Sequence, residues 1–162
     1  MSGGQLRLLP AVPLTAEAFA PFGDVLEAPA DPGRVYFEKA LGNRRDGVPP
    51  SISITHRTPT ALPMHSTTME RHPTSSQSFI PMDAGRWLIV VAPHAPAGGP
   101  DMARAAAFVA RPDQGITYGV DVWHHPFTVL DRPQRFAIVM WRDGSPLDDE
   151  FVTVPRFEIV EP

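Results

Sequence analysis

The amino-acid sequence predicts an all-β fold, in the form of a barrel, a sandwich or a jelly roll. Its 20 prolines and 12 glycines are spread along the 162 residues instead of being gathered in one linker. Because proline cannot donate to a sheet ladder and is poorly tolerated inside helices, this spread favours many short elements with sharp connections. Short apolar or alternating segments, typical of strands, fill the stretches between the prolines. The length fits a single domain, which we expect to span residues 1–162.

The composition argues against several classes of partner. The net charge is −4 and the 14 lysines and arginines are scattered, whereas a nucleic-acid-binding protein usually has a basic stripe. The longest apolar runs, 87–92 and 136–141, are far shorter than the roughly 20 residues that a helix needs to cross a membrane. Residues 1–9 contain no apolar segment of the signal-peptide kind, so we expect a cytoplasmic protein. The absence of cysteine excludes disulfides, thiolate metal sites and cysteine nucleophiles.

Helices are expected to be few and short. One is predicted near the start of the chain, where Thr15 is a suitable N-cap, Glu17 lies in the first turn, and Pro21 with Gly23 ends the helix. A single further helical turn is expected at 101–105.

The strands are predicted from alternation and from short apolar runs. Residues 51–55 alternate polar and apolar side chains, as in a half-buried strand, and 87–92 are continuously apolar, as in a strand buried on both faces. Residues 28–50 are rich in Pro, Gly, Arg and Asp and are predicted to form a long loop, with one strand considered at 35–37. The segment 131–134 fits a hairpin connection. The expected strands are 22–26, 51–55, 64–72, 77–80, 87–92, 108–109, 120–123, 127–130, 136–141 and 151–154.

Two segments contain the side chains that could perform chemistry. In the first, Glu70 and His72 point the same way because side chains alternate along a strand, and Gln77 is expected to return on the neighbouring strand after a tight turn. The second segment contains Tyr118 and the adjacent pair His124 and His125, which must face opposite sides of a strand. We expect His124 to face the interior and His125 to lie at the rim.

Histidine, glutamate and glutamine from separate segments suit either of two uses. They can bind a divalent metal, because imidazole and carboxylate or amide oxygens are common ligands. They can also transfer protons without a metal, because imidazole titrates near neutrality. The alternative is structural: an adjacent histidine pair is more often a surface or hydrogen-bonded pair, and Trp123 and Tyr118 are more often core or rim residues than substrate contacts.

Taken together, these segments resemble the ureidoglycolate lyase family. The resemblance extends to the N-terminal residues 14–25 and to Pro100-Asp101, and it covers most of the chain in the family's order. The motifs that carry it are Arg71-His72-Pro73, Ser76-Gln77-Ser78-Phe79-Ile80-Pro81, Gly115-Ile116-Thr117-Tyr118 and Trp123-His124-His125-Pro126.

The resemblance implies a cupin-like double-stranded β-helix, a jelly-roll barrel with one or two short peripheral helices, commonly found as a homodimer. It implies cleavage of (S)-ureidoglycolate to glyoxylate and urea in allantoin breakdown, the reaction of a carbon–nitrogen lyase of the amidine-lyase type. It also associates a divalent metal, nickel in particular, with the site. The chain departs from the family within 36–46, where an Asn-Asn-Gly element is missing and Arg44 or Arg45 would fill the basic role.

Cleavage of ureidoglycolate needs a base, an acid and an anchor for the substrate carboxylate, for which arginine is well suited. We expect His124 or His72 to be the base, and Glu70 or the other histidine to protonate the departing urea nitrogen. If a metal is bound, His72, Gln77 and His124 are the expected ligands. The residues expected to bind the substrate are Arg71, Gln77, Tyr118, Trp123, His125 and Arg45.

Two other functions fit the same residues. One is a lyase or hydrolase of another small α-hydroxy acid derivative, suggested by the altered segment 36–46. The other is a non-catalytic barrel that binds a small molecule, which would keep the aromatic lining and an arginine but would not need the histidine pair.

Overall fold

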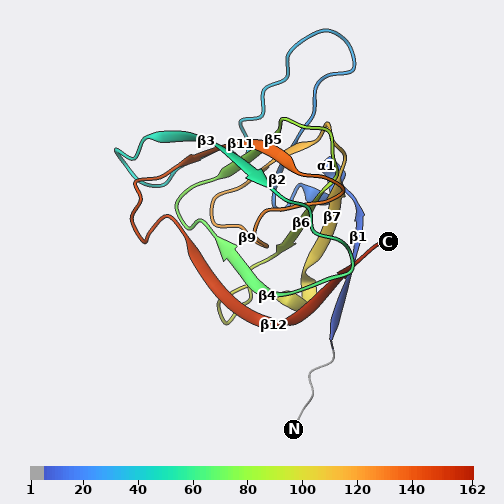
Figure 1. Ribbon diagram of the computed structural model, residues 1–162. Helices are drawn as coiled ribbons and strands as arrows, with labels where there is room; N and C mark the ends of the chain where they lie inside the picture. The colour runs from blue at the N-terminus through green and yellow to red at the C-terminus, as the bar shows by residue number, and fades with distance from the viewer. Residues whose placement is uncertain (1–5) are drawn as a thin grey trace.

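The computed structural model describes residues 6–162, and within them nearly all regular structure is β-strand (Figure 1). The exceptions in this range are α1 (Ala16–Phe19) and the single 3-10 turn η1 (Met102–Arg104). Thr15 caps α1 as expected, because its hydroxyl accepts a hydrogen bond from the backbone N–H of Ala18 at 3.2 Å. The all-β prediction with few short helices is confirmed.

Of the segment 1–9 considered for a signal peptide, residues 1–5 lie outside the described part of the chain. Within 6–162, no helix is long and apolar enough to span a membrane.

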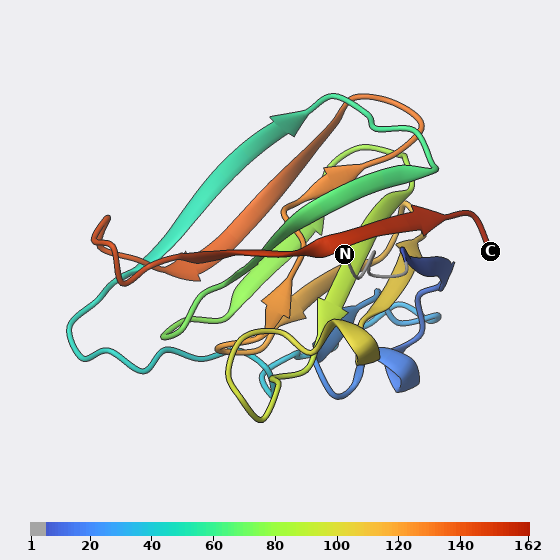
Figure 2. The ribbon, with the colours of Figure 1, turned by 90° about the horizontal axis from the view of Figure 1, so that it is seen from below.

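The first sheet has seven strands, which are β1 (Arg7–Pro13), β4 (Met64–Arg71), β6 (Trp87–Ala92), β7 (Ala106–Ala110), β9 (Trp123–His124), β10 (Thr128–Val129) and β12 (Glu150–Val160). Their order is β10-β6-β7-β1-β12-β4-β9, and β9 also pairs with β6, so β9 closes the sheet into a ring. β1 runs parallel to β12 and β7, while the other pairs are antiparallel. Figure 2 shows the long β12 beside β4.

The second sheet is entirely antiparallel and has the order β2-β8-β5-β11-β3. Its strands are β2 (Gly23–Leu26), β3 (Pro50–Arg57), β5 (Gln77–Pro81), β8 (Gly115–Tyr118) and β11 (Gln134–Trp141).

β6 belongs to two hydrophobic cores at once. All six of its residues are buried, and their side chains alternate between the two clusters. Leu88 and Val90 pack inside the ring with Met69 and Phe157, whereas Trp87 and its alternate neighbours pack against residues of the second sheet. The prediction of a strand buried on both faces is therefore confirmed, and the second cluster lies between the two sheets.

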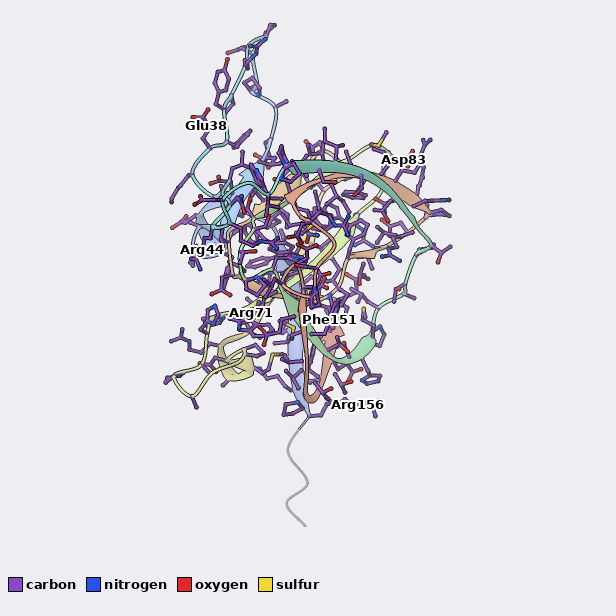
Figure 3. The ribbon with its side chains drawn as sticks, turned by 90° about the vertical axis from the view of Figure 1, so that its left-hand side faces the viewer. Glu38, Arg44, Arg71, Asp83, Phe151 and Arg156 are labelled. Carbon is purple, nitrogen blue, oxygen red and sulfur yellow. The ribbon has the colours of Figure 1, made fainter. Side chains whose placement is uncertain are left out.

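Several local predictions are wrong. Of the strand expected at 120–123, only Trp123 lies in a strand, β9. Residues 35–37 form no strand; they belong to the long loop between β2 and β3, which projects from the body of the molecule and carries Glu38 (Figures 1 and 3). The segment 131–134 is not a hairpin turn, because β10 pairs with β6 in the first sheet and β11 with β5 and β3 in the second. β1 was not expected, and it holds its place by parallel pairing with distant strands that local sequence does not reveal.

Candidate active site

Glu70 and His124 are cross-strand partners where β9 pairs with β4. Glu70 Oε1 lies 3.3 Å from His124 Nε2, and the two side chains are 13% and 1% exposed. Nδ1 of His124 lies 2.9 Å from the Val122 carbonyl oxygen, so Nδ1 donates, and in the neutral ring the lone pair is then on Nε2. This Nε2 is buried and lacks a hydrogen-bond partner. A lone pair facing a largely shielded carboxylate is unfavourable unless a proton or a cation lies between them.

His72 follows directly after β4, and oxygen atoms surround both of its ring nitrogens. Nε2 lies 2.9 Å from Gln77 Oε1, and Nδ1 lies 3.0 Å from the Asp148 carbonyl oxygen and 2.8 Å from Asp149 Oδ1. Burial lowers the pKa of His72, but the hydrogen bond to Asp149, the charge of Glu70 and the Asp148 carbonyl outweigh it and raise this pKa overall. The oxygen atoms at both ring nitrogens therefore stabilise the protonated form of His72 relative to a histidine in water.

Tyr118, at the end of β8, fixes the plane of the His124 ring. The two rings stack with centroids 4.1 Å apart and planes 16° apart, and the His72 ring lies 5.2 Å from that of His124. Desolvation raises the pKa of the Tyr118 phenol far above its usual value, with a smaller contribution from the charge of Glu70. The phenol accordingly stays protonated.

The donor atoms of Glu70, His72 and His124 all lie within 4.8 Å of one another, and we call these three residues the His/Glu cluster. Two imidazole nitrogens and a carboxylate oxygen form a donor set suited to a divalent cation. Nδ1 of each histidine is already bound to an oxygen atom, which is how metal-binding histidines are commonly oriented. The residues thus fit a metal when His72 is a neutral imidazole that keeps its proton on Nδ1, and the unpartnered Nε2 of His124 is the atom that most needs one.

Gln77 lies next to the cluster, but the chain between His72 and Gln77 does not form the hairpin that was expected. β4 and β5 belong to different sheets and do not pair, so residues 72–76 cross from one sheet to the other instead of forming a hairpin. Gln77 is opposite Met140 of β11, with its Nε2 3.6 Å from the methionine sulfur. The amide oxygen is therefore directed at His72.

Arg71 lies outside the cluster because its side chain leaves β4 on the other face from Glu70 and His72. Its guanidinium donates to Glu150 Oε2 at 2.6 Å and to Asp121 Oδ1 at 2.8 Å, and it lies over the Trp123 ring at 4.7 Å. It is occupied by two carboxylates and has no contact with the histidines.

Trp123 and His125 flank His124 and point away from the cluster. Trp123 is 1% exposed and packs in the core inside the ring. His125 was expected at the rim, but its ring packs edge-on against Phe157, and its Nε2 lies 3.0 Å from Ser66 Oγ. Burial lowers the pKa of His125 to about 4, so it is neutral near pH 7.

Arg45, from the loop between β2 and β3, lies beside the cluster without joining it. Its guanidinium is paired with Asp148 at 2.6 Å and Asp143 at 3.2 Å. Sequence reasoning missed Asp148 and Asp149 because they lie 76 or more residues after His72, in a segment that carries only a turn signal.

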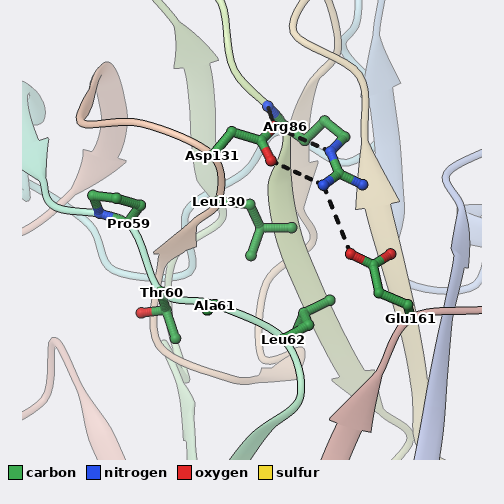
Figure 4. Close-up of a pocket in the computed structure, with 8 residues that line it drawn as sticks. All are labelled: Pro59, Thr60, Ala61, Leu62, Arg86, Leu130, Asp131 and Glu161. Atoms are coloured by element: carbon green, nitrogen blue, oxygen red, sulfur yellow. Dashed lines mark hydrogen bonds and ion pairs between the residues drawn. The ribbon is translucent and has the colours of Figure 1, made fainter.

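A separate pocket of about 380 Å³ lies away from the cluster (Figure 4). Its lining residues are Pro59, Thr60, Ala61, Leu62, Arg86, Leu130, Asp131 and Glu161. The cation at its edge, Arg86, is already paired with Asp131 at 2.9 Å and Glu161 at 3.7 Å. The pocket contains no member of the cluster, so the candidate site stays with Glu70, His72 and His124.

The family model and the sequence relatives agree in family. The family model described as ureidoglycolate lyase matches residues 6–159. A ureidoglycolate lyase from Burkholderia cepacia is 42% identical over 147 residues, covering 85% of this chain and 81% of the relative. One from Brucella melitensis is 39% identical over 147 residues and covers 83% of each chain. A solved dTDP sugar isomerase structure from Desulfovibrio desulfuricans has a TM-score of 0.47 at 18% identity, covering 83% of this chain and 82% of that chain.

Proposed function

Because the chain belongs to the ureidoglycolate lyase family, we propose that it cleaves (S)-ureidoglycolate to glyoxylate and urea, as a carbon–nitrogen lyase of the amidine-lyase type. The observation that supports this activity is the His/Glu cluster, in which donors from β4, β9 and the segment after β4 lie within 4.8 Å of one another. This brings together a base, an acid and a positive charge in one buried place.

The pair His124 and Glu70 is suited to move one proton across the substrate. Nε2 of His124 has a free lone pair, so it takes the proton of the substrate hydroxyl as the carbonyl of glyoxylate forms. The carbon–nitrogen bond breaks with its electrons going to the urea nitrogen. Glu70, 3.3 Å from His124, receives the proton and delivers it to that nitrogen, so the cluster returns to its starting state.

We propose that the substrate carboxylate lies next to His72, the residue of the cluster that can carry a positive charge. Arg71 and Arg45 each already bind two carboxylates, and neither contacts the histidines. His72 lies beside His124, with ring centroids 5.2 Å apart, so a positive charge on His72 would attract the substrate carboxylate toward the base while its ring nitrogens stay on Gln77, Asp148 and Asp149. Gln77 and Tyr118 keep their proposed roles as groups that orient the substrate and the histidine rings.

As an alternative to these proton transfers, a divalent metal would be held by Glu70, His124 and a neutral His72, with Gln77 Oε1 beside His72 as a further ligand. Nickel is the ion that the family resemblance favours. When bound, such a cation polarises the hydroxyl and carboxylate oxygens that it contacts. We also propose a cytoplasmic homodimer, and light scattering on the purified protein would give twice the chain mass of 17.7 kDa if that is correct.

The activity is tested by incubating the protein with racemic ureidoglycolate, with and without added nickel or manganese. We expect glyoxylate and urea to appear together, well above spontaneous breakdown, and half of the racemate to be consumed. Absence of release under every metal condition would contradict the proposed substrate. Binding of the substrate without turnover would instead favour a non-catalytic barrel, and turnover of a related α-hydroxy acid derivative would favour the other alternative.

A further inference from the structure

Arg45, in the loop between β2 and β3, is paired with residues of the segment 143–149, which lies in the loop between β11 and β12. Nη2 of Arg45 donates to Asp148 Oδ1 at 2.6 Å, and Nη1 lies 3.2 Å from Asp143 Oδ1 and 3.4 Å from Ser145 Oγ. The second carboxylate oxygen of Asp148 accepts from the backbone N–H of Gly144 at 2.7 Å. The Arg45 and Asp148 side chains are only 14% and 2% exposed, so this pairing is largely shielded from water.

The same 143–149 loop supplies both oxygens that face Nδ1 of His72. They are the backbone carbonyl of Asp148 at 3.0 Å and the carboxylate of Asp149 at 2.8 Å. Acceptors at Nδ1 keep a proton there, fix the rotation of the ring and direct Nε2 toward the cluster. Arg45 does not touch His72, but it holds Asp148, whose carbonyl does.

The segment that carries Arg45 is also tied to the chain just after His72. The backbone N–H of Arg44 donates to the Thr74 carbonyl at 2.7 Å, and that of Ser76 donates to the Gly42 carbonyl at 2.9 Å. The Gly42 N–H donates in turn to the Ser76 hydroxyl at 2.9 Å. The residues around Arg45 therefore link the two segments that flank the His72 ring.

From these contacts we infer that Arg45 is a positioning residue, which holds the 143–149 loop so that Asp148 and Asp149 orient His72, and is not an anchor for the substrate. The inference rests on the proposed function for its kinetic consequence, but its structural consequence does not depend on that function. If Arg45 positions the loop, its substitution should lower kcat. If Arg45 anchors the substrate, its substitution should instead raise KM.

The test uses the full chain with Arg45→Met, Arg45→Lys and Asp148→Asn, and Arg44→Met as the matched control. Arg44 is adjacent, its side chain is 61% exposed, and it forms a long ion pair with Asp121 at 3.9 Å. We expect Arg45→Met to lower kcat by about 10- to 100-fold with KM within about threefold, as for other groups that orient a site histidine. Arg45→Lys should recover part of the loss, and Arg44→Met should behave like the wild type.

Nitrogen-15 spectra of histidine-labelled protein give the readout that does not need turnover. In the wild type we expect His72 Nδ1 to be protonated and protected from exchange, and in Arg45→Met and Asp148→Asn we expect this signal to be lost or averaged. The double variant Arg45→Met/Asp148→Asn should show no larger loss of kcat than either single variant, because both substitutions break the same ion pair.

An unchanged His72 signal in the variants, or a raised KM with unchanged kcat, would overturn the inference. If Arg45→Met does not fold, the same comparisons are made with Arg45→Lys. If the wild type fails to cleave ureidoglycolate, the spectra still decide the positioning role.

Discussion

Among single residues, the pair that bears most directly on the chemistry is Glu70 and His124. The carboxylate lies 3.3 Å from a histidine nitrogen that has no hydrogen-bond partner, and only one proton or cation can satisfy both. The neighbours of this pair along each strand, Arg71 and His125, face the other way. The site thus depends on which of two adjacent residues faces the space between the sheets.

Replacing Glu70 with Gln tests the proton path directly. The amide keeps the size of the side chain but cannot carry the proton, so we expect kcat to fall by about 10²- to 10⁴-fold. The midpoint of thermal unfolding should change little, because Glu70 is at the edge of the buried region with 13% exposure. Steady-state kinetics and a melting curve check this. A kcat within threefold of the wild type would remove Glu70 from the proposed mechanism.

The lowered pKa of His125 should make the stability of the folded protein depend on pH. Its folded pKa of about 4 lies below the value of about 6.5 for an unfolded chain, so only the unfolded state binds this proton between those limits. The free energy of unfolding should therefore fall as the pH drops from 6.5 to 4, by up to roughly 3 kcal/mol from this residue. His72 has a raised pKa, so its contribution is fully present below 6.5 and declines only at higher pH.

Urea unfolding at pH 7 and pH 4.5 measures this effect in the wild type and in His125→Gln, which can keep a hydrogen bond to Ser66. The variant should lose less stability than the wild type over the same interval. Equal losses in the two proteins would show that His125 does not titrate as its burial implies.

At the scale of elements, β8 is a strand of the second sheet that both packs within that sheet and contacts the candidate site. It lies between β2 and β5, and its last residue, Tyr118, stacks on His124. Gly115 begins the strand, and a Cβ atom there would lie 2.6 Å from the carbonyl oxygen of Phe79. The strand can approach β5 this closely only without a side chain at that position.

Gly115→Ala should therefore lower the free energy of unfolding by about 1–3 kcal/mol, because the backbone of β5 or β8 must shift. Gly33→Ala is the matched control, since a Cβ atom at Gly33 meets nothing closer than 3.8 Å. Denaturant unfolding of both variants gives the comparison. Equal stability of Gly115→Ala and Gly33→Ala would contradict the packing described for β8.

Elements also show how far sequence reasoning reaches. Alternation and apolar runs predicted β3 and β6. The two-residue period of strand side chains also predicted that Glu70 and His72 share one face and that His124 and His125 face opposite sides. Which strands pair is set by contacts between distant residues, so the parallel pairing of β1 and the separation of β10 from β11 were not predictable. For the same reason Asp148 and Asp149 could not be assigned to His72.

For the whole molecule, the decisive feature is the closure of the ring by β9. This two-residue strand pairs with β4 on one side and β6 on the other, and it brings His124 opposite Glu70. The His/Glu cluster is therefore present only when the barrel is closed, and a ligand of the cluster should stabilise the folded state.

Binding of a metal gives a measurable form of this linkage. At a free nickel concentration about 100 times Kd, the folded state should gain roughly 2.7 kcal/mol, seen as a higher melting temperature. Chelation should reverse the gain, and His124→Gln should abolish it. A wild-type melting curve unaffected by nickel and manganese, with no metal in the purified protein, would argue that the cluster works through protons alone.

The central claim, that the His/Glu cluster cleaves ureidoglycolate, is tested most directly by kcat/KM of two neighbouring variants, His124→Ala and His125→Gln. Both are measured for release of glyoxylate and urea, at a temperature where circular dichroism shows each protein folded. We predict a loss of at least about 100-fold for His124→Ala and a change within several-fold for His125→Gln. Equal effects of the two substitutions, or full activity without His124, would contradict the account.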